Sequence, residues 1–152
     1  MTFGVGAQPV AGGYAGDFEG FTLKALWMRH TLTAALLVAA LIHLLPLSGV
    51  LGAERLATLY GVPVADPHLM ILMRHRAVLF GLLGVFLGVA AFIPALQGAA
   101  LVAGMISVVS FLWLAVSVGG YNAAIARVVV ADLVALASLA LGAAVWGWER
   151  WR

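Results

Sequence analysis

Ionisable side chains are rare in this chain, and three of them stand next to one another. Arg74, His75 and Arg76 lie at the start of a long apolar segment. Charged groups are costly inside a bilayer, and those that occur in membrane-spanning segments are candidates for functional sites. Together, these residue types could hold the polar head of a small molecule or handle a proton.

Asp132, in the last long apolar segment, is the acid that these cations could meet. An unpaired carboxylate at that depth costs on the order of 2–3 kcal/mol. Arg127 is five residues away, which places it about 140° around a helix and makes it a poor partner. We therefore expect Arg74 or Arg76 to pair with Asp132. Two interpretations stay open: an interhelical ion pair that fixes packing, and a polar pocket or proton-handling site.

Two histidines come from different apolar segments at a similar expected depth. His43 and His75 could be the axial ligands of a b-type haem, although no spacing motif supports the pair. With Asp132 they could also bind a metal ion, by residue type alone. A hydrogen-bonded packing histidine is the alternative. We therefore predict no cofactor and no metal site, and b-type haem and a quinone are the alternatives that these residues leave open.

Four apolar segments must position these side chains, at about residues 26–47, 69–93, 99–118 and 124–148. At about 1.5 Å per residue, segments of this length can cross a bilayer core about 30 Å thick. Within the loop of residues 48–68, residues 53–60 have the spacing of a short amphipathic helix lying at the membrane interface. The sequence therefore predicts an all-α integral membrane protein with a four-helix transmembrane bundle.

The domain organisation follows from the same pattern. Residues 1–23 are rich in glycine, and we expect them to form a flexible N-terminal arm. Residues 24–152 form the transmembrane domain. Four spans put both termini on the same side of the membrane. Lys and Arg tie at four on each side of the membrane. Three of the four on the side of the 48–68 loop look embedded in helix ends, and discounting them favours cytoplasmic termini for this multi-pass protein. The bacterial inner membrane is the location that the family resemblance described below implies.

In this arrangement the polar residues converge on one membrane face, the face of the 48–68 loop. The opposite half of every span is apolar or small. No catalytic residue is predicted, and the candidate site residues are Arg74, His75, Arg76, Asp132, His43, Arg127, Tyr121 and Asn122.

Small residues recur along three of the four spans, and such stripes let neighbouring helices approach closely. Arg74 is in register with the stripe of the second span, so we expect it to face protein. The stripes are Ala77, Gly81, Gly84 and Gly88 in the second span, Ala99, Ala103, Ser107, Ser110 and Ser117 in the third, and Ala131, Ala135, Ser138 and Gly142 in the fourth.

Composition excludes several classes of protein. The chain is 64% hydrophobic and 9% charged, with a mean hydropathy of +1.12, whereas a soluble domain is about 25% charged. Its net charge of +2 does not indicate nucleic-acid binding. The absence of cysteine excludes disulfides, thiolate metal sites and iron–sulfur clusters. No hydrolase, zinc-protease or nucleotide-binding motif is present, which favours a non-catalytic protein.

Two stretches resemble an uncharacterised family of small bacterial four-helix membrane proteins whose layout is similar to that of the DoxX-like families. The first is LIHLLPLSGVLGAERL (residues 41–56), running on to MRHRAVLFG (73–81), and the second is GGYNAAIARVVVAD (119–132). The resemblance covers about residues 25–145 and implies the fold but no firm activity. Members are sometimes labelled phosphopantetheine adenylyltransferase. That label does not fit a chain without a nucleotide-binding motif or alternating strands and helices.

We expect a non-catalytic accessory or assembly subunit of a larger membrane complex, with the lipid bilayer and other membrane protein subunits as partners and no nucleic acid. The alternative is a module that binds a quinone-like or lipid molecule through Arg74, Arg76, Asp132, His43 and Tyr121. Proton-coupled transport is a weaker third hypothesis, because no polar residue lines the opposite half of the bundle.

Overall fold

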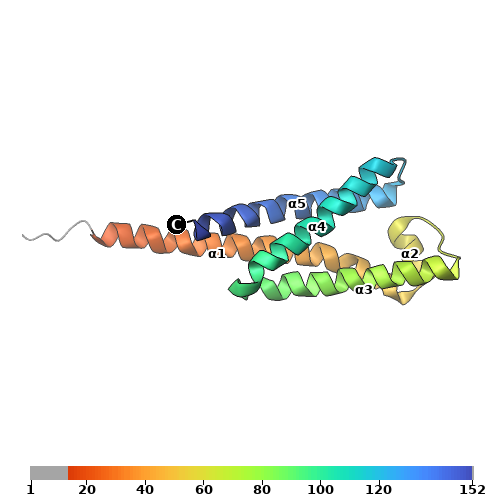
Figure 1. Cartoon of the computed structure of the whole chain (residues 1–152), viewed down its shortest axis with the longest axis horizontal. Coiled ribbons are helices and arrows are strands. Elements are labelled where there is room, and N and C mark those ends of the chain that lie inside the picture. The colour runs from red at the N-terminus through yellow and green to blue at the C-terminus, as the bar shows by residue number, and fades with distance from the viewer. Residues whose placement is uncertain (1–13, 152) are drawn as a thin grey trace, which may run out of the picture.

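The structure, a computed structural model, describes residues 14–151 and contains helices but no strand in that part of the chain. Most of these residues belong to five α-helices and one short 3₁₀ helix (Figure 1). In chain order the elements are α1 (Tyr14–Leu44), the 3₁₀ helix η1 (Leu45–Leu51), α2 (Ala53–Tyr60), α3 (Pro67–Ala90), α4 (Pro94–Val118) and α5 (Ala123–Arg150).

Four helical stretches are long and apolar enough to cross a membrane: Leu26–Leu51, Pro67–Ala90, Pro94–Val118 and Ala123–Trp148. Large apolar side chains such as Trp113 and Val116 are exposed on the outer surface of the bundle, where lipid can solvate them. The chain is therefore a multi-pass membrane protein. The prediction of an all-α bundle with four spans is confirmed.

The N-terminal arm is shorter than the sequence predicts. α1 begins at Tyr14, so ten residues of the expected irregular arm, 14–23, are helical, while residues 1–13 lie outside the described residues. Extending an existing helix is far easier than nucleating one, and the acidic Asp17 and Glu19 favour the N-terminal turns of a helix. These effects outweigh Gly16 and Gly20, each of which is about 1 kcal/mol less favourable than alanine in a helix.

The third span also begins earlier than expected. Residues 94–98, which lie between the predicted second and third spans, are the first residues of α4, and the turn lies at residues 91–93. Proline is well suited to the first position of a helix, because its amide nitrogen needs no partner there and its φ angle is already helical. Pro94 therefore starts α4 instead of interrupting it.

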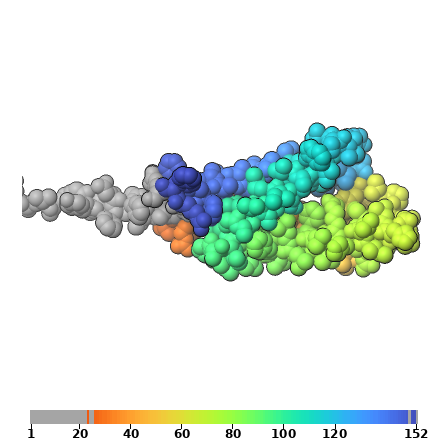
Figure 2. Space-filling view, in the orientation of Figure 1, coloured from red at the N-terminus to blue at the C-terminus, as the bar shows by residue number. Residues whose placement is uncertain are grey.

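α1 is the central helix of the bundle. It packs along both α3 and α5, and α4 crosses the bundle obliquely and packs on the same two helices (Figure 1). In the space-filling view, the side chains of α3 and α4 cover this face of the molecule and hide most of α1 (Figure 2). The N-terminal end of α1 and the C-terminal end of α5 lie at the same end of the bundle.

Small residues bring α3 against α1 and η1, as predicted. Ala77 is 1% exposed and Gly81 and Gly84 are buried. A Cβ atom added at Gly84 would lie 2.8 Å from Cγ of Leu44 and 3.0 Å from the carbonyl oxygen of Ala40. The small-residue stripe of α3 is therefore buried in contacts within the bundle, where it sets the distance between α3 and α1.

α2 is amphipathic, and its apolar face packs on other parts of the protein. Leu56 and Tyr60 are buried and form a second apolar cluster with Val64, against which α3 and α5 contribute partly buried side chains. The side-chain amide of Asn122 donates to the carbonyl oxygen of Tyr60 (2.9 Å), which ties the end of α2 to the start of α5. The short amphipathic helix predicted within residues 53–60 is therefore present, and its docking places α2 over one end of the bundle.

Candidate functional site

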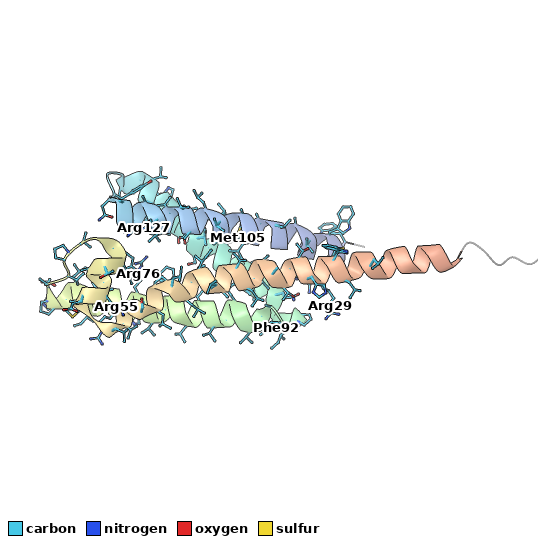
Figure 3. The ribbon with its side chains drawn as sticks, turned by 180° about the vertical axis from the view of Figure 1, so that it is seen from behind. Arg29, Arg55, Arg76, Phe92, Met105 and Arg127 are labelled. Atoms are coloured by element: carbon cyan, nitrogen blue, oxygen red, sulfur yellow. The ribbon has the colours of Figure 1, made fainter. Side chains whose placement is uncertain are left out.

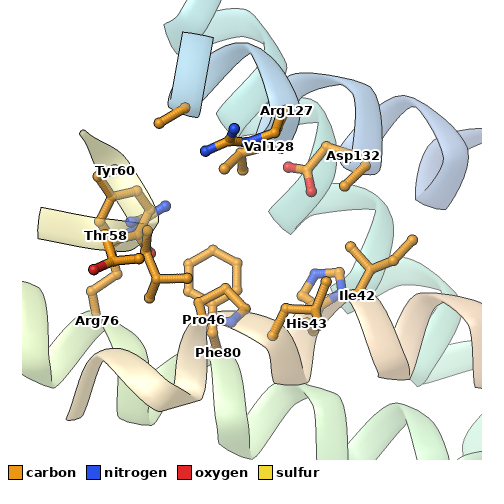
Figure 4. Close-up of a pocket in the computed structure, with 14 residues that line it drawn as sticks. Ile42, His43, Pro46, Thr58, Tyr60, Arg76, Phe80, Arg127, Val128 and Asp132 are labelled. Atoms are coloured by element: carbon orange, nitrogen blue, oxygen red, sulfur yellow. The ribbon is translucent and has the colours of Figure 1, made fainter. Parts of the chain in front are cut away.

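A cavity of about 220 Å³ lies beneath α2, between the end of α1 with η1, α3 and α5 (Figure 4). Its walls are mostly apolar, and one histidine, two arginines and one aspartate line it, namely His43, Arg76, Arg127 and Asp132. The remaining lining residues are Ile42, Leu45, Pro46, Thr58, Leu59, Tyr60, Phe80, Ala124, Val128 and Ala131. A mostly apolar cavity with a few convergent polar groups has the character of a small-molecule site.

Asp132 is the most unusual of these side chains. It is 6% exposed, and its carboxylate points into the cavity from α5 (Figure 4). Within residues 14–151, no hydrogen bond and no direct ion pair reaches it. The positive charge of Arg76 attracts it across the cavity without a direct contact. Asp132 as a residue is therefore largely buried, while its carboxylate oxygens face the open space of the cavity and receive no hydrogen bond from the described residues.

Arg76 reaches the cavity from α3 and is held by aromatic rings. Its guanidinium carbon lies 4.8 Å from the ring centroid of Phe80 and 5.2 Å from that of Tyr60. Cation–π contacts of this kind contribute about 0.5–2 kcal/mol, depending on how far the groups are desolvated. They orient the guanidinium and leave its N–H groups free to donate to a molecule in the cavity.

Arg127 approaches the cavity from the opposite side. It extends from α5, whereas Arg76 comes from α3, and the two lie at the end of the bundle that carries α2 (Figure 3). Asn122 caps α5, because its Oδ1 accepts a hydrogen bond from the backbone N–H of Ile125 (2.9 Å). The cap fixes the start of α5 and with it the positions of Arg127 and Asp132.

His43 is part of the cavity wall. Its Nδ1 donates to the carbonyl oxygen of Ala39 (2.8 Å), and its Nε2 lies 3.1 Å from Oγ of Ser107. Because a carbonyl only accepts, the proton is on Nδ1, and Nε2 of the neutral ring accepts from the Ser107 hydroxyl. The ring also stacks on Phe80, with centroids 5.7 Å apart. His43 is therefore anchored at both nitrogens.

The other four candidate residues lie outside the cavity. Arg74 is exposed, and its Nε donates to the carbonyl oxygen of Val50 (2.9 Å), which ties α3 to η1. His75 and Tyr121 are exposed and do not line the cavity, while Asn122 serves as the cap and the tie to α2. The structure thus brings together four of the eight candidates.

Neither metal-ligand arrangement considered from the sequence is formed. Both nitrogens of His43 are engaged, and His75 is exposed and does not line the cavity, so the two imidazoles do not face one slot. Among the described residues, no three His, Asp or Glu side chains gather in a way that could hold a metal ion.

Sequence reasoning missed Tyr60, Phe80, Thr58 and Ser107. Phe80 follows Arg76 by four residues, so its place on the same helix face was readable from the sequence. A histidine in an apolar segment needs a hydrogen-bond partner, and the serines of α4 were the available ones. Nothing in the sequence indicated that Tyr60 and Thr58 would fold over the bundle.

No protein-family model, no curated protein and no solved structure matches this chain, so the site is interpreted from its own geometry.

Proposed function

We propose that this protein is a non-catalytic membrane module that binds a small lipophilic molecule with a polar head, a quinone-like ring or a lipid head group, in the cavity under α2. The observation that carries the proposal is Asp132, a residue that is 6% exposed and whose carboxylate faces the cavity without a hydrogen-bond partner among the described residues. Buried polar groups almost always have a hydrogen-bond partner. A bound molecule would supply one.

The composition of the walls supports a lipophilic ligand. Leu45, Pro46, Leu59 and Val128 line the same space as the charged groups. Apolar walls stabilise apolar parts of a ligand, and a few fixed polar groups orient it. The volume of about 220 Å³ corresponds to about seven water molecules in the liquid, so a cluster of waters is the competing occupant.

Our second proposal is that the protein is an accessory subunit, and this role would use a different surface from the cavity under α2. Two of the three stripes that suggested it are engaged within the bundle, at Gly84 on α3 and Gly142 on α5. A groove with small residues lies between α4 and the C-terminal end of α5, lined by Pro94, Ala95, Gly98, Ala99, Val102, Ala103, Ile106, Trp146 and Arg150. A helix of another subunit is the occupant that this proposal requires.

We further propose that the protein resides in the bacterial inner membrane, as its resemblance to small bacterial membrane proteins implies. We propose cytoplasmic termini, which the positive residues favour once those embedded in helix ends are discounted. We also propose that the chain is related to the small bacterial four-helix membrane proteins of DoxX-like layout that it resembles. Neither the membrane location nor this relationship supplies an activity.

The test of the binding role is a comparison of the wild-type protein with Asp132→Asn, each purified gently from native membranes. Mass spectrometry of extracted small molecules and an absorption spectrum are recorded on the same fraction. We expect a near-stoichiometric lipophile in the wild type and about tenfold less in the variant. A hydrogen bond to a charged group contributes about 1.5–3 kcal/mol, and about 1.4 kcal/mol is a factor of ten.

Glu54→Gln is the matched control, because it makes the same change of carboxylate to amide on the exposed face of α2, outside the cavity. Equal small-molecule content in the wild type and Asp132→Asn would contradict the binding role. Stoichiometric larger proteins without a lipophile would favour the accessory subunit instead.

A further inference from the structure

The side chains that line the cavity under α2 restrict the chemistry of its ligand more tightly than the volume of the cavity does. Asp132 is buried, lacks a partner in the described chain and points into the cavity. A carboxylate accepts hydrogen bonds and donates none. A ligand that satisfies Asp132 must therefore present a donor, which a quinone carbonyl, an ester or an ether does not have.

The charges around the cavity argue against a cationic donor. Arg76 and Arg127 line the same space as Asp132, so the fixed charges include two cations and one anion. An ammonium group would gain from Asp132 but would be repelled by the half-buried Arg76 and, more weakly, by the exposed Arg127, whose charge is screened by its surroundings. The carboxylate thus needs a donor, and the arginines disfavour one that carries a positive charge.

An anionic ligand fails for the opposite reason. A phosphate or carboxylate would bind the guanidinium groups well, but it would leave Asp132 without a donor and would be repelled by it. The apolar walls at Leu45, Leu59 and Val128 add a further cost for any ion that enters. The ligand that avoids both conflicts is neutral.

We propose that the site binds a neutral, lipophilic molecule through a hydroxyl group, an alcohol or a phenol, which donates to Asp132 and accepts from Arg76 or Arg127. This inference rests on the proposed binding function and narrows its ligand class: among quinone-like rings and lipid head groups, it admits only neutral molecules that carry a hydroxyl group. A hydroxyl carries one donor and two acceptor lone pairs, so a single small group satisfies both kinds of partner. The aromatic contacts hold Arg76 in place for this role, because they fix its guanidinium at the cavity wall.

The experiment uses the full chain in nanodiscs and four probes that share one apolar body. They are para-butylphenol, its methyl ether para-butylanisole, para-butylbenzylamine and para-butylbenzoate. Equilibrium dialysis against empty nanodiscs measures binding beyond partition into lipid. We expect the phenol to bind the wild-type protein about tenfold more tightly than the ether, since the two differ by one donor. We expect the amine and the benzoate to bind more weakly than the phenol.

The preference for the phenol must depend on Asp132. It is expected to shrink in Asp132→Asn and to disappear in Asp132→Leu, which removes every acceptor while remaining compatible with a membrane helix. Glu54→Gln should retain it. A folded Asp132→Leu is recognised by an unchanged elution volume and helical circular dichroism, and Asp132→Asn keeps the test decisive if the leucine variant fails to fold.

The possible results separate this inference from the function on which it rests. Binding of the ether as tightly as the phenol, or tighter binding of the amine or the benzoate, would overturn the hydroxyl assignment but leave a lipophile site in place. Binding of none of the probes, together with equal native content in the wild type and Asp132→Asn, would overturn both and would leave the cavity to water.

Discussion

The same helices pack differently in the two halves of this bundle. In the half that contains the turn between α3 and α4, Leu36, Leu87 and Leu139 are fully buried in one apolar core. In the half that carries α2, α5 and α3 face a cavity instead. The first half is held by contact between helices, whereas the second is closed by a short helix that folds over it.

Glycine explains the close packing of the first half. A Cβ atom at Gly104 would lie 3.1 Å from a methyl group of Leu139, and one at Gly142 would lie 3.2 Å from Cβ of Ala35. In the other half, α5 presents Asp132 where a close contact would need a small or apolar residue. The comparison shows that the chain gives up close packing where it places buried charge, which is the usual relation between a binding site and its scaffold.

The largest expected difference between the halves comes from the same truncation made in each. Leu139→Ala removes a fully buried side chain, and we expect it to lower the free energy of unfolding by about 2 kcal/mol, near the lower end of the range for buried leucine because lipid also solvates apolar groups. Leu59→Ala only enlarges an existing cavity and should cost less than half as much. Reversible unfolding in mixed detergent micelles measures both, and equal losses would remove the distinction between the halves.

A second pair of variants tests the close approach of α3 and α1. Gly84→Ala places a methyl group 3.0 Å from a backbone oxygen, that of Ala40, which cannot move without the helix. We expect a loss of about 1.5 kcal/mol from overpacking. Gly147→Ala, on α5, meets nothing within 4 Å and should leave stability unchanged or slightly raised, because alanine favours helix more than glycine does. Thermal unfolding of the two variants side by side decides the point, and tolerance of alanine at Gly84 would show that the stripe is loosely packed.

In the half that contains the cavity, we expect a substitution to raise the stability of the protein, whereas the substitutions in the packed half lower it. Asp132→Asn removes a buried negative charge without a described partner, and we expect the ligand-free protein to gain about 1 kcal/mol of stability. Glu54→Gln on the exposed face of α2 should change stability by less than about 0.5 kcal/mol. The same unfolding assay after delipidation measures this. A loss of stability in Asp132→Asn would mean that the carboxylate is satisfied within the protein and that the cavity is architecture.

How much of this comparison could be read from the sequence depends on the kind of signal. The four spans follow from the lengths of the apolar segments, and the tight side of α3 follows from one clear stripe at Gly81 and Gly84. For α4 the stripe was misassigned. Ala99 and Ala103 were expected to pack, but the buried residues are their neighbours Ala100 and Gly104. Small residues lie on several sides of this helix, so they do not fix its rotation.

The candidate site could be predicted from the sequence only in part. The convergence of polar residues on one end followed from the topology, but the choice between Arg74 and Arg76 did not. Their side chains point about 200° apart on a helix, and the outcome depends on which neighbour each meets. Arg74 meets the backbone of η1, and Arg76 meets Tyr60 from α2. The docking of α2 over the bundle is a long-range packing event that no local pattern in the sequence encodes.

The boundary between the two halves offers the smallest and most specific test. His43 borders the cavity, and its bond to Ser107 of α4 reaches into the packed bundle. We expect Ser107→Ala to cost about 0.6 kcal/mol, a typical value for a hydrogen bond between membrane helices. Ser117→Ala removes only a bond to the carbonyl of Leu114 on its own helix and should cost less. If the phenol preference of the cavity also weakens in Ser107→Ala, then the packed half positions the wall of the site. If stability falls while the preference is unchanged, the two halves are energetically separate and the cavity depends on α2 alone.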